Sequence, residues 1–312
     1  MKQSQSYKTE GVHRGRRLTS LYKFLFIAIC TAGKPLGGIA RQSVYHWLAR
    51  KAYLVPEFKP HKDKWGNEFF LSPYLFIDRH IIAFGYYDLN LDLCLQGNVK
   101  PGMVTMDIGA NIGTVTIHMA KLVKSYGVVH AFEPVPPILE RLNGHVKLNK
   151  MEDVVRIHPI ALSNGIGKME VVYADEMTEN QGMGSIANTD NEVVSLRCEI
   201  PTTTIDDFVR KNGVSHIDFI KIDIQGAETL LLEGGKDVFG RMSLDLLIEV
   251  SPSDLCFISK NSVDLMQMLS AFGYHMYEIE GGRPSKKINI EKTEPEWAAD
   301  NIFCTKKQIT SP

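Results

Sequence analysis

MDIGANIG, residues 106–113, combines an acidic residue at the end of an apolar run with two glycines that bracket an asparagine. The run VTMDIG (104–109) is typical of a short buried strand, and apolar residues recur at helical spacing from Asn111 to Val123. Glycine has no Cβ, so Gly109 and Gly113 let the backbone turn tightly and let a ligand approach it. The stretch therefore predicts a strand, a ligand-binding loop and a helix in succession.

Strand-like and helical runs alternate from Met103 onward. Such alternation predicts an α/β fold with a mostly parallel sheet and helices on both faces, which binds ligands at the carboxyl ends of its strands. Residues 167–207 break the alternation with two strand-like runs around a polar loop, and predict a β-hairpin inserted between the third and fourth strands. The other expected elements are strands at 127–134, 154–163, 216–226, 244–250, 275–280 and 299–306, and helices at 136–150, 227–235 and 263–274.

The first 75 residues predict a helical or mixed extension that precedes a domain over 76–312. Residues 43–58 are typical of a helix that stops before Pro56, and residues 66–88 of short strands or hairpins. An apolar run over 21–33 follows basic residues and is too short to span a bilayer. Three interpretations stay open: a helix packed on the protein body, a basic amphipathic helix on a membrane surface through residues 15–35, and an export signal.

The composition narrows the class of protein. The chain has 312 residues, 44% of them hydrophobic, and a formal net charge of −1. These values are typical of a globular protein, and the absence of a basic excess argues against a nucleic-acid partner. The five cysteines are far apart and form no C-x-x-C pair, so we expect neither a zinc site nor a disulfide framework. They favour a cytoplasmic location, with membrane association open; the oligomeric state is not predicted.

The charge beside the loop favours a methyl donor over a dinucleotide. A dinucleotide loop reads G-x-G-x-x-G, whereas this loop reads G-x-x-x-G with Asn111 at its middle. Asp107 repels a pyrophosphate but suits the sulfonium and ammonium groups of S-adenosylmethionine. Glu133 ends the next strand, where a carboxylate accepts hydrogen bonds from ribose hydroxyls, and Asn111 is expected to cap the helix. The alternatives are an NAD(P)-dependent oxidoreductase and a non-catalytic cofactor-binding scaffold.

Two further strand ends carry acidic side chains suited to catalysis. Asp223 ends the fourth strand and is the candidate that receives or orients the proton of an acceptor hydroxyl, or instead holds the methionine end of the donor. Lys221 shares its face of the strand and is a candidate catalytic residue or, alternatively, an ion-pair partner of Asp223 or Glu249. Glu249 ends the fifth strand and is expected to bind acceptor hydroxyls; without a clear third ligand, we predict no metal. Glu228 opens the next helix and is a candidate acceptor contact.

The loop TENQGMGSIANTD (178–190) projects from the predicted hairpin insert. Asn180, Gln181 and Ser185 offer hydrogen-bonding groups suited to a polyhydroxylated acceptor. Two glycines let the loop move, so we hypothesise a lid over the acceptor; a solvated surface loop is the alternative.

Five segments together resemble the FkbM family of S-adenosylmethionine-dependent methyltransferases: 100–113, 129–136, 160–172, 202–208 and 217–235. The resemblance runs from about Gly85 to Lys306 and implies a Rossmann-like class I methyltransferase with a seven-stranded sheet whose last strand is antiparallel. It also implies methyl transfer to a hydroxyl oxygen of a sugar, glycan or other hydroxylated natural product. Asp88 stands where the family is expected to carry glutamate. The implied cofactor residues are Asp107, Gly109, Asn111, Gly113, Glu133, Pro134, Ala161, Leu162 and Asp223.

Overall fold

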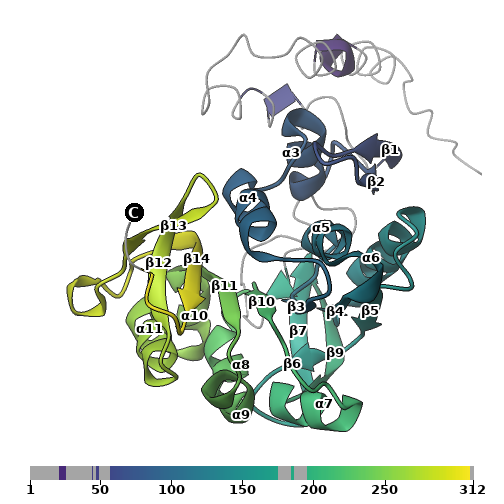
Figure 1. Ribbon diagram of the computed structural model, residues 1–312. Coiled ribbons are helices and arrows are strands. Elements are labelled where there is room, and N and C mark those ends of the chain that lie inside the picture. The colour runs from purple at the N-terminus through teal and green to yellow at the C-terminus, as the bar shows by residue number, and fades with distance from the viewer. Residues whose placement is uncertain are drawn as a thin grey trace, which may run out of the picture. The chain divides into compact units, whose positions relative to one another are not determined.

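A computed structural model describes residues 21–25, 44, 47–48, 57–174, 184–185 and 195–309 (Figure 1). The chain forms two compact units, Met1–Tyr87 and Asp88–Pro312. The sequence predicts that the methyltransferase domain begins at residue 76, and that boundary stays a prediction.

The first unit contains a hairpin and a helix. Strands β1 (Lys59–Lys62) and β2 (Glu68–Leu71) pair antiparallel, and α3 (Phe76–Phe84) ends at Gly85. The expectation of strands over 66–88 is therefore right for β2 and wrong for α3. The carboxylate of Asp78 accepts a hydrogen bond from the Ser72 amide at 2.9 Å, and an acidic side chain in the first turn favours a helix. Most of the helix expected over 43–58 lies outside the described residues.

The larger sheet of the second unit has eight strands in the order β13-β12-β14-β11-β10-β3-β4-β5. The five strands from β11 to β5 are parallel, whereas β14 is antiparallel to β11 and β12. This order confirms the predicted Rossmann-like α/β architecture with an antiparallel last strand. The bounds are β3 Val104–Ile108, β4 Val128–Phe132, β5 Val155–His158, β10 Phe219–Ile222, β11 Asp245–Val250, β12 His275–Glu280, β13 Arg283–Lys287 and β14 Ala299–Thr305.

The eighth strand corrects the predicted count of seven. Gly281 and Gly282 both adopt positive φ angles, 56° and 76°, and join β12 to β13 in a tight hairpin. Paired positive φ angles match the turn geometry that suits twisted antiparallel strands. The sequence RPSKK of β13 lacks the apolar alternation of a strand, but charged residues and proline are typical of an exposed sheet edge.

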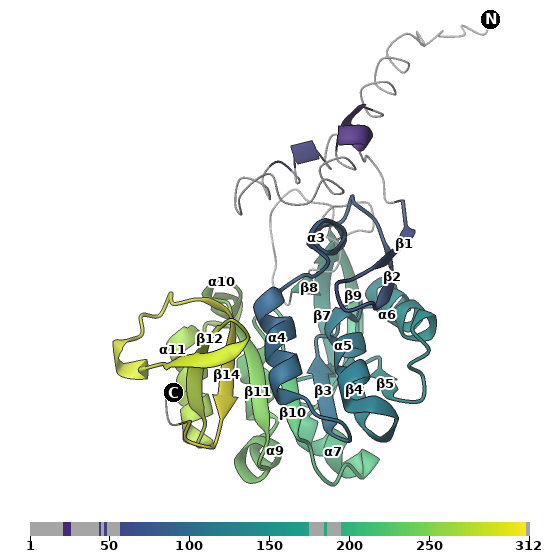
Figure 2. The ribbon, with the colours of Figure 1, turned by 45° about the horizontal axis from the view of Figure 1, so that its top comes forward.

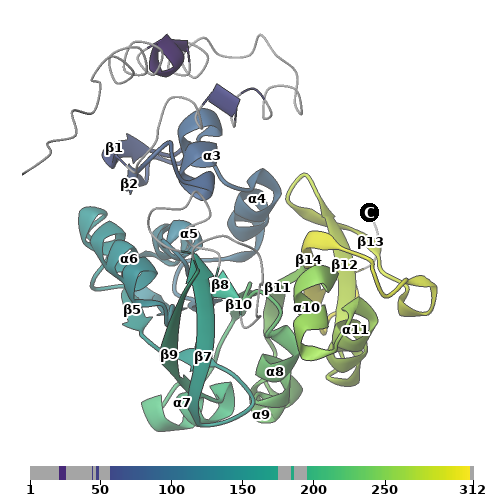
Figure 3. The same cartoon turned by 180° about the vertical axis from the view of Figure 1, so that it is seen from behind.

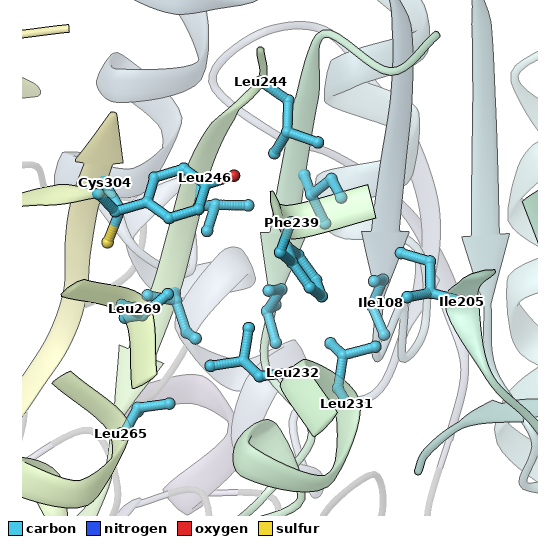
Figure 4. Close-up of a cluster of buried hydrophobic side chains, with 14 of the residues drawn as sticks. Ile108, Ile205, Leu231, Leu232, Phe239, Leu244, Leu246, Leu265, Leu269 and Cys304 are labelled. Atoms are coloured by element: carbon cyan, nitrogen blue, oxygen red, sulfur yellow. The ribbon is translucent and has the colours of Figure 1, made fainter. Parts of the chain in front are cut away.

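Helices cover both faces of this sheet (Figures 2 and 3). One buried cluster includes Leu231, Phe239 and Leu265, which belong to three helices, α8 (Glu228–Glu233), α9 (Lys236–Arg241) and α11 (Ser262–Ala271) (Figure 4). A second cluster includes Leu95 of α4 (Leu89–Asn98) and Met119 of α5 (Thr114–Val123). The helices are α4 Leu89–Asn98, α5 Thr114–Val123, α6 Pro136–Leu148, α7 Ile205–Asn212, α8 Glu228–Glu233, α9 Lys236–Arg241, α10 Pro252–Leu255 and α11 Ser262–Ala271, with short 3-10 turns at Lys124–Tyr126, Cys256–Ile258 and Ile290–Lys292.

The predicted hairpin insert lies between β5 and β10 and belongs to a second sheet, seen from behind in Figure 3. Its strands are β6 Ala161–Leu162, β7 Gly167–Ala174, β8 Gly184–Ser185 and β9 Ser195–Thr203. Residues 154–163 were expected to form one strand but form two, β5 in the large sheet and β6 beside β9. Pro159 separates them, because proline lacks the N–H that would continue the ladder.

Candidate active site

The loop after β3 lies directly against the turn after β10. Gly109 has a φ of 83°, and a Cβ at this position would overlap the carbonyl oxygen of Asp223. The Asp223 amide also donates to the carbonyl oxygen of Ile108 at 3.0 Å. Only glycine fits at 109, so the first strand end and the fourth strand end form one continuous site.

Asp107 supplies an unsatisfied buried acceptor in this site. Its side chain is fully buried, and its Oδ2 accepts a hydrogen bond from the Thr116 hydroxyl at 2.5 Å. Among the described residues, none donates to its Oδ1. Burial raises the pKa of Asp107, and the charge of Lys221 opposes that rise. A buried oxygen without a donor is costly, and an N–H or cationic ligand would satisfy it.

Glu133 organises the same loop from the end of β4. Its buried carboxylate accepts hydrogen bonds from the amides of Asn111 at 3.0 Å and Val135 at 2.9 Å. Burial raises the pKa of Glu133 to about 7, although these amides favour its charged form. The carboxylate therefore lies at the loop, as the sequence predicted.

Asn111 does not cap the following helix, so that expectation is wrong. Helix α5 begins at Thr114, its N-cap is Gly113, and no side chain caps it. Asn111 has a φ of 51°, and its Oδ1 accepts a hydrogen bond from the adjacent Ile112 amide at 2.7 Å. The left-handed loop residue thus bonds to its neighbour before the helix starts.

Lys221 and Asp223 form an ion pair at the end of β10. The Lys221 Nζ lies 2.7 Å from Asp223 Oδ2, with the two side chains 4% and 31% exposed. Burial raises the pKa of Asp223, but the Lys221 charge and hydrogen bonds outweigh it and bring the pKa to about 2. Asp223 is therefore an ionised carboxylate whose side chain is partly exposed.

Gln225 joins this carboxylate to Glu249, a role that the sequence did not indicate. Its Nε2 lies 3.1 Å from Asp223 Oδ1 and 3.5 Å from Glu249 Oε2, and its φ is 53°. Burial and the charge of Asp223 raise the pKa of Glu249 to about 9. Burial and the charge of Asp223 therefore favour the protonated form of Glu249, whereas Lys221 favours the ionised form of Asp223. The sequence signal that could indicate this role is the position of Gln225 in a tight turn between two acidic residues, Asp223 and Glu228.

Glu228 faces its own turn. The carboxylate is buried, and its Oε1 accepts from the amides of Ile224 and Gly226, each at 3.2 Å. Burial raises its pKa to about 7. This arrangement indicates that Glu228 shapes the turn carrying Gln225, and gives no support to the predicted acceptor contact.

The remaining candidates are more dispersed. Pro134 is half-buried directly after Glu133, while Ala161 and Leu162 lie on β6 of the second sheet. Ser185 lies on β8 opposite Val172. Asn180, Gln181 and most of the hypothesised lid lie outside the described residues.

Asp88 caps a helix. Its Oδ1 accepts from the Leu91 amide at 3.1 Å at the start of α4, and its Oδ2 from Asn301 at 3.2 Å. These two hydrogen bonds give Asp88 a structural role at a position where the family is expected to carry glutamate. Across the part of the chain that the structure describes, no three His, Cys, Asp or Glu side chains gather as metal ligands.

The site suits a cationic, phosphate-free nucleoside. Asp107 offers a free buried oxygen, and Glu133 and Asp223 add two further carboxyl groups at the strand ends. Acidic side chains at three neighbouring strand ends disfavour a pyrophosphate and suit ammonium and sulfonium groups. The donor set therefore fits S-adenosylmethionine.

Comparisons with known proteins identify the family of this chain. A family model described as the methyltransferase FkbM domain matches residues 107–276, more than half of the chain. Methyltransferase sdnD from Sordaria araneosa is 21% identical over 255 residues, which cover 73% of this chain and 90% of sdnD. The 31-O-demethyl-FK506 methyltransferase FkbM from Streptomyces tacrolimicus is 24% identical over 181 residues, covering 49% of this chain and 68% of that protein.

Another relative and one solved structure are also similar to this chain. The 2-O-methyltransferase NoeI from Sinorhizobium fredii is 27% identical over 149 residues, covering 44% of this chain and 59% of NoeI. The crystal structure of methyltransferase FkbM from Methylobacillus flagellatus has 15% identity and a TM-score of 0.42, covering 90% of this chain and 57% of that one. Because the matching family model describes a methyltransferase domain, the alternative of an NAD(P)-dependent oxidoreductase is rejected.

Proposed function

The chain belongs to the FkbM methyltransferase family, which uses S-adenosylmethionine, and we propose that it methylates a hydroxyl oxygen of a sugar, glycan or other hydroxylated natural product. The names of two relatives, a 31-O-demethyl-FK506 methyltransferase and a 2-O-methyltransferase, support an oxygen acceptor. The observation that carries the proposal is the ionised, partly open Asp223 beside the Gly109 loop.

The loop residues would hold the donor. Asp107 would accept a hydrogen bond from a cationic or N–H group through its free Oδ1, and Glu133 would accept from the ribose hydroxyls. Gly109, Asn111, Gly113 and Pro134 would line the loop, with Ala161 and Leu162 toward the adenine. The bound donor supplies an electrophilic methyl group on a sulfonium centre.

Asp223 would act on the acceptor. Its carboxylate accepts a hydrogen bond from the acceptor hydroxyl and takes up the proton as the oxygen–methyl bond forms, then releases it to water. A carboxylate whose pKa is about 2 is a weak base, so proton transfer occurs late and positioning of the hydroxyl contributes most. Lys221 and Gln225 fix the carboxylate, and protonated Glu249 offers a donor to other acceptor oxygens.

Two measurements test the proposal. Calorimetry of the full chain with S-adenosylmethionine tests donor binding, and absence of binding at high micromolar concentration contradicts the proposal. Incubation with labelled donor and a panel of methyl glycosides, phenols and amines then tests the acceptor atom. We expect transfer to oxygen, a loss of about 100-fold or more in Asp223→Asn, and full activity in Asp153→Asn, an exposed acid outside the site. If Asp223→Asn also abolishes donor binding, Asp223 holds the donor instead.

A further inference from the structure

Exposed large hydrophobic side chains are concentrated in the unit Met1–Tyr87. This unit contains eight of the twelve such side chains among the described residues, although the other unit is far larger. A soluble protein rarely exposes a contiguous apolar patch unless a partner covers it. The eight are Leu21, Phe24, Leu25, Val44, Trp47, Phe58, Phe70 and Tyr87.

Several of these side chains belong to one surface. Leu21, Phe24 and Leu25 are spaced along one face of the helical segment 21–25. The ring of Tyr22 in that segment meets the Trp47 ring edge-on with centroids 5.6 Å apart. Phe24 and Trp47 are 68% and 52% exposed. The helical segment and the indole that contacts it through Tyr22 therefore both expose apolar groups to solvent.

An ion pair ties the start of the β1–β2 hairpin to this helix. The Lys23 Nζ lies 3.3 Å from Glu57 Oε2, and the Lys59 Nζ lies 3.0 Å from Glu57 Oε1. Phe58, between Glu57 and Lys59 in the chain, is exposed. Helical spacing places Lys23 on the side of the segment away from Leu21, Phe24 and Leu25. We call Leu21, Phe24, Leu25 and Trp47, with Lys23 and Lys59 on the polar side, the apolar–basic surface.

The mixture of residues fits a bilayer better than a protein partner. Long lysine side chains keep their charge in water while their stems lie along apolar surface, and tryptophan favours the membrane interface. Two lysines share Glu57, and Arg14, Arg16 and Arg17 precede the helix in the sequence, so anionic headgroups are favoured. Protein interfaces are instead depleted in lysine. None of the described helices is long and apolar enough to cross a membrane.

We propose that the apolar–basic surface binds the chain peripherally to an anionic lipid bilayer. The proposal is independent of the acceptor and of the methyl-transfer step. It deepens one of the three interpretations of residues 15–35 and assigns the contact to named side chains on described segments.

Vesicle flotation of the full chain tests this proposal. We expect flotation with phosphatidylcholine vesicles containing about 30% phosphatidylglycerol, weak flotation with phosphatidylcholine alone, and release at high salt. The double variant Phe24→Ala/Trp47→Ala should need at least about tenfold more lipid for half-maximal binding. The control Tyr126→Ala removes an aromatic ring that is 70% exposed in the other unit, and should float like the wild type.

Fluorescence locates the contact. The chain has three tryptophans; in the background Trp65→Phe/Trp297→Phe, emission from Trp47 should shift to the blue on addition of anionic vesicles. Donor binding by calorimetry shows that each variant is folded. Failure of the wild type to float, equal flotation of the double variant, or concentration-dependent self-association without vesicle binding would each overturn the proposal.

Discussion

Substitution of Gly109 by alanine should disturb both stability and catalysis. A non-glycine residue at its φ of 83° costs about 1–2 kcal/mol. The added Cβ would overlap the Asp223 carbonyl oxygen, a backbone atom that cannot rotate away, and such overpacking costs about 1–3 kcal/mol more. We therefore expect the free energy of unfolding to fall by about 2–5 kcal/mol.

The matched control is Gly213→Ala. Gly213 also has a positive φ, 64°, but no atom lies within 4 Å of its Cβ position, so only the backbone cost of about 1–2 kcal/mol applies. Urea unfolding of both variants gives the difference, and turnover of Gly109→Ala should fall at least about tenfold because Asp223 shifts. If Gly109→Ala is no less stable than Gly213→Ala and turns over normally, the close approach of the two strand ends is wrong.

Three other changes test neighbouring parts of the site. Glu249→Gln should remove a pH dependence of stability. The folded wild type keeps a proton on Glu249 that the unfolded chain releases, so the unfolding free energy of the wild type falls relative to that of the variant as pH rises from about 4.5 to about 9. Urea unfolding of both proteins across that pH range measures the difference. Thr116→Val removes the hydroxyl that donates a hydrogen bond to buried Asp107, and should lower the free energy of unfolding by about 1–3 kcal/mol. It should also weaken the binding of S-adenosylmethionine in calorimetry. Unchanged affinity for S-adenosylmethionine would contradict a role of Asp107 in binding it. Deletion of 179–189 should raise the KM for the acceptor without changing donor affinity, and a variant with unchanged KM and turnover would end the lid hypothesis.

Much of the fold was predictable because its signals are local. Apolar strand runs such as 104–109 and glycines at strand ends determine a parallel sheet with its ligand loop, and the structure confirms this order. The elements that were missed depend on contacts distant in sequence. Charged β13 is a strand because a glycine pair folds it onto β12, and α3 is a helix although its residues favour strands.

The positions of the candidate site residues were predictable at the level of strand ends. Asp107, Glu133, Asp223 and Glu249 follow from the rule that ligands bind at carboxyl ends of parallel strands. The different roles proposed for these acids were not predictable, since the roles depend on side-chain geometry. Gln225 reaches two acids only through a left-handed turn, and the buried Lys221 favours a charged Asp223 while burial favours a protonated Glu249.

Asn111 shows the limit of motif reasoning. Its residue type suits a helix cap, but the helix starts beyond Gly113, and the side chain bonds within the loop instead. The backbone path, rather than the residue type, decides which amide an asparagine reaches.

Transfer of a labelled methyl group from S-adenosylmethionine tests the central claim most directly. Wild-type protein and Asp223→Asn would be incubated with donor carrying a deuterated methyl group and cell extract, and the products compared by mass spectrometry. The account predicts a wild-type product labelled on a hydroxyl oxygen, formed at least about 100-fold more slowly by the variant. Label on a nitrogen or carboxyl group, equal labelling by both proteins, or donor binding without any transfer would contradict it.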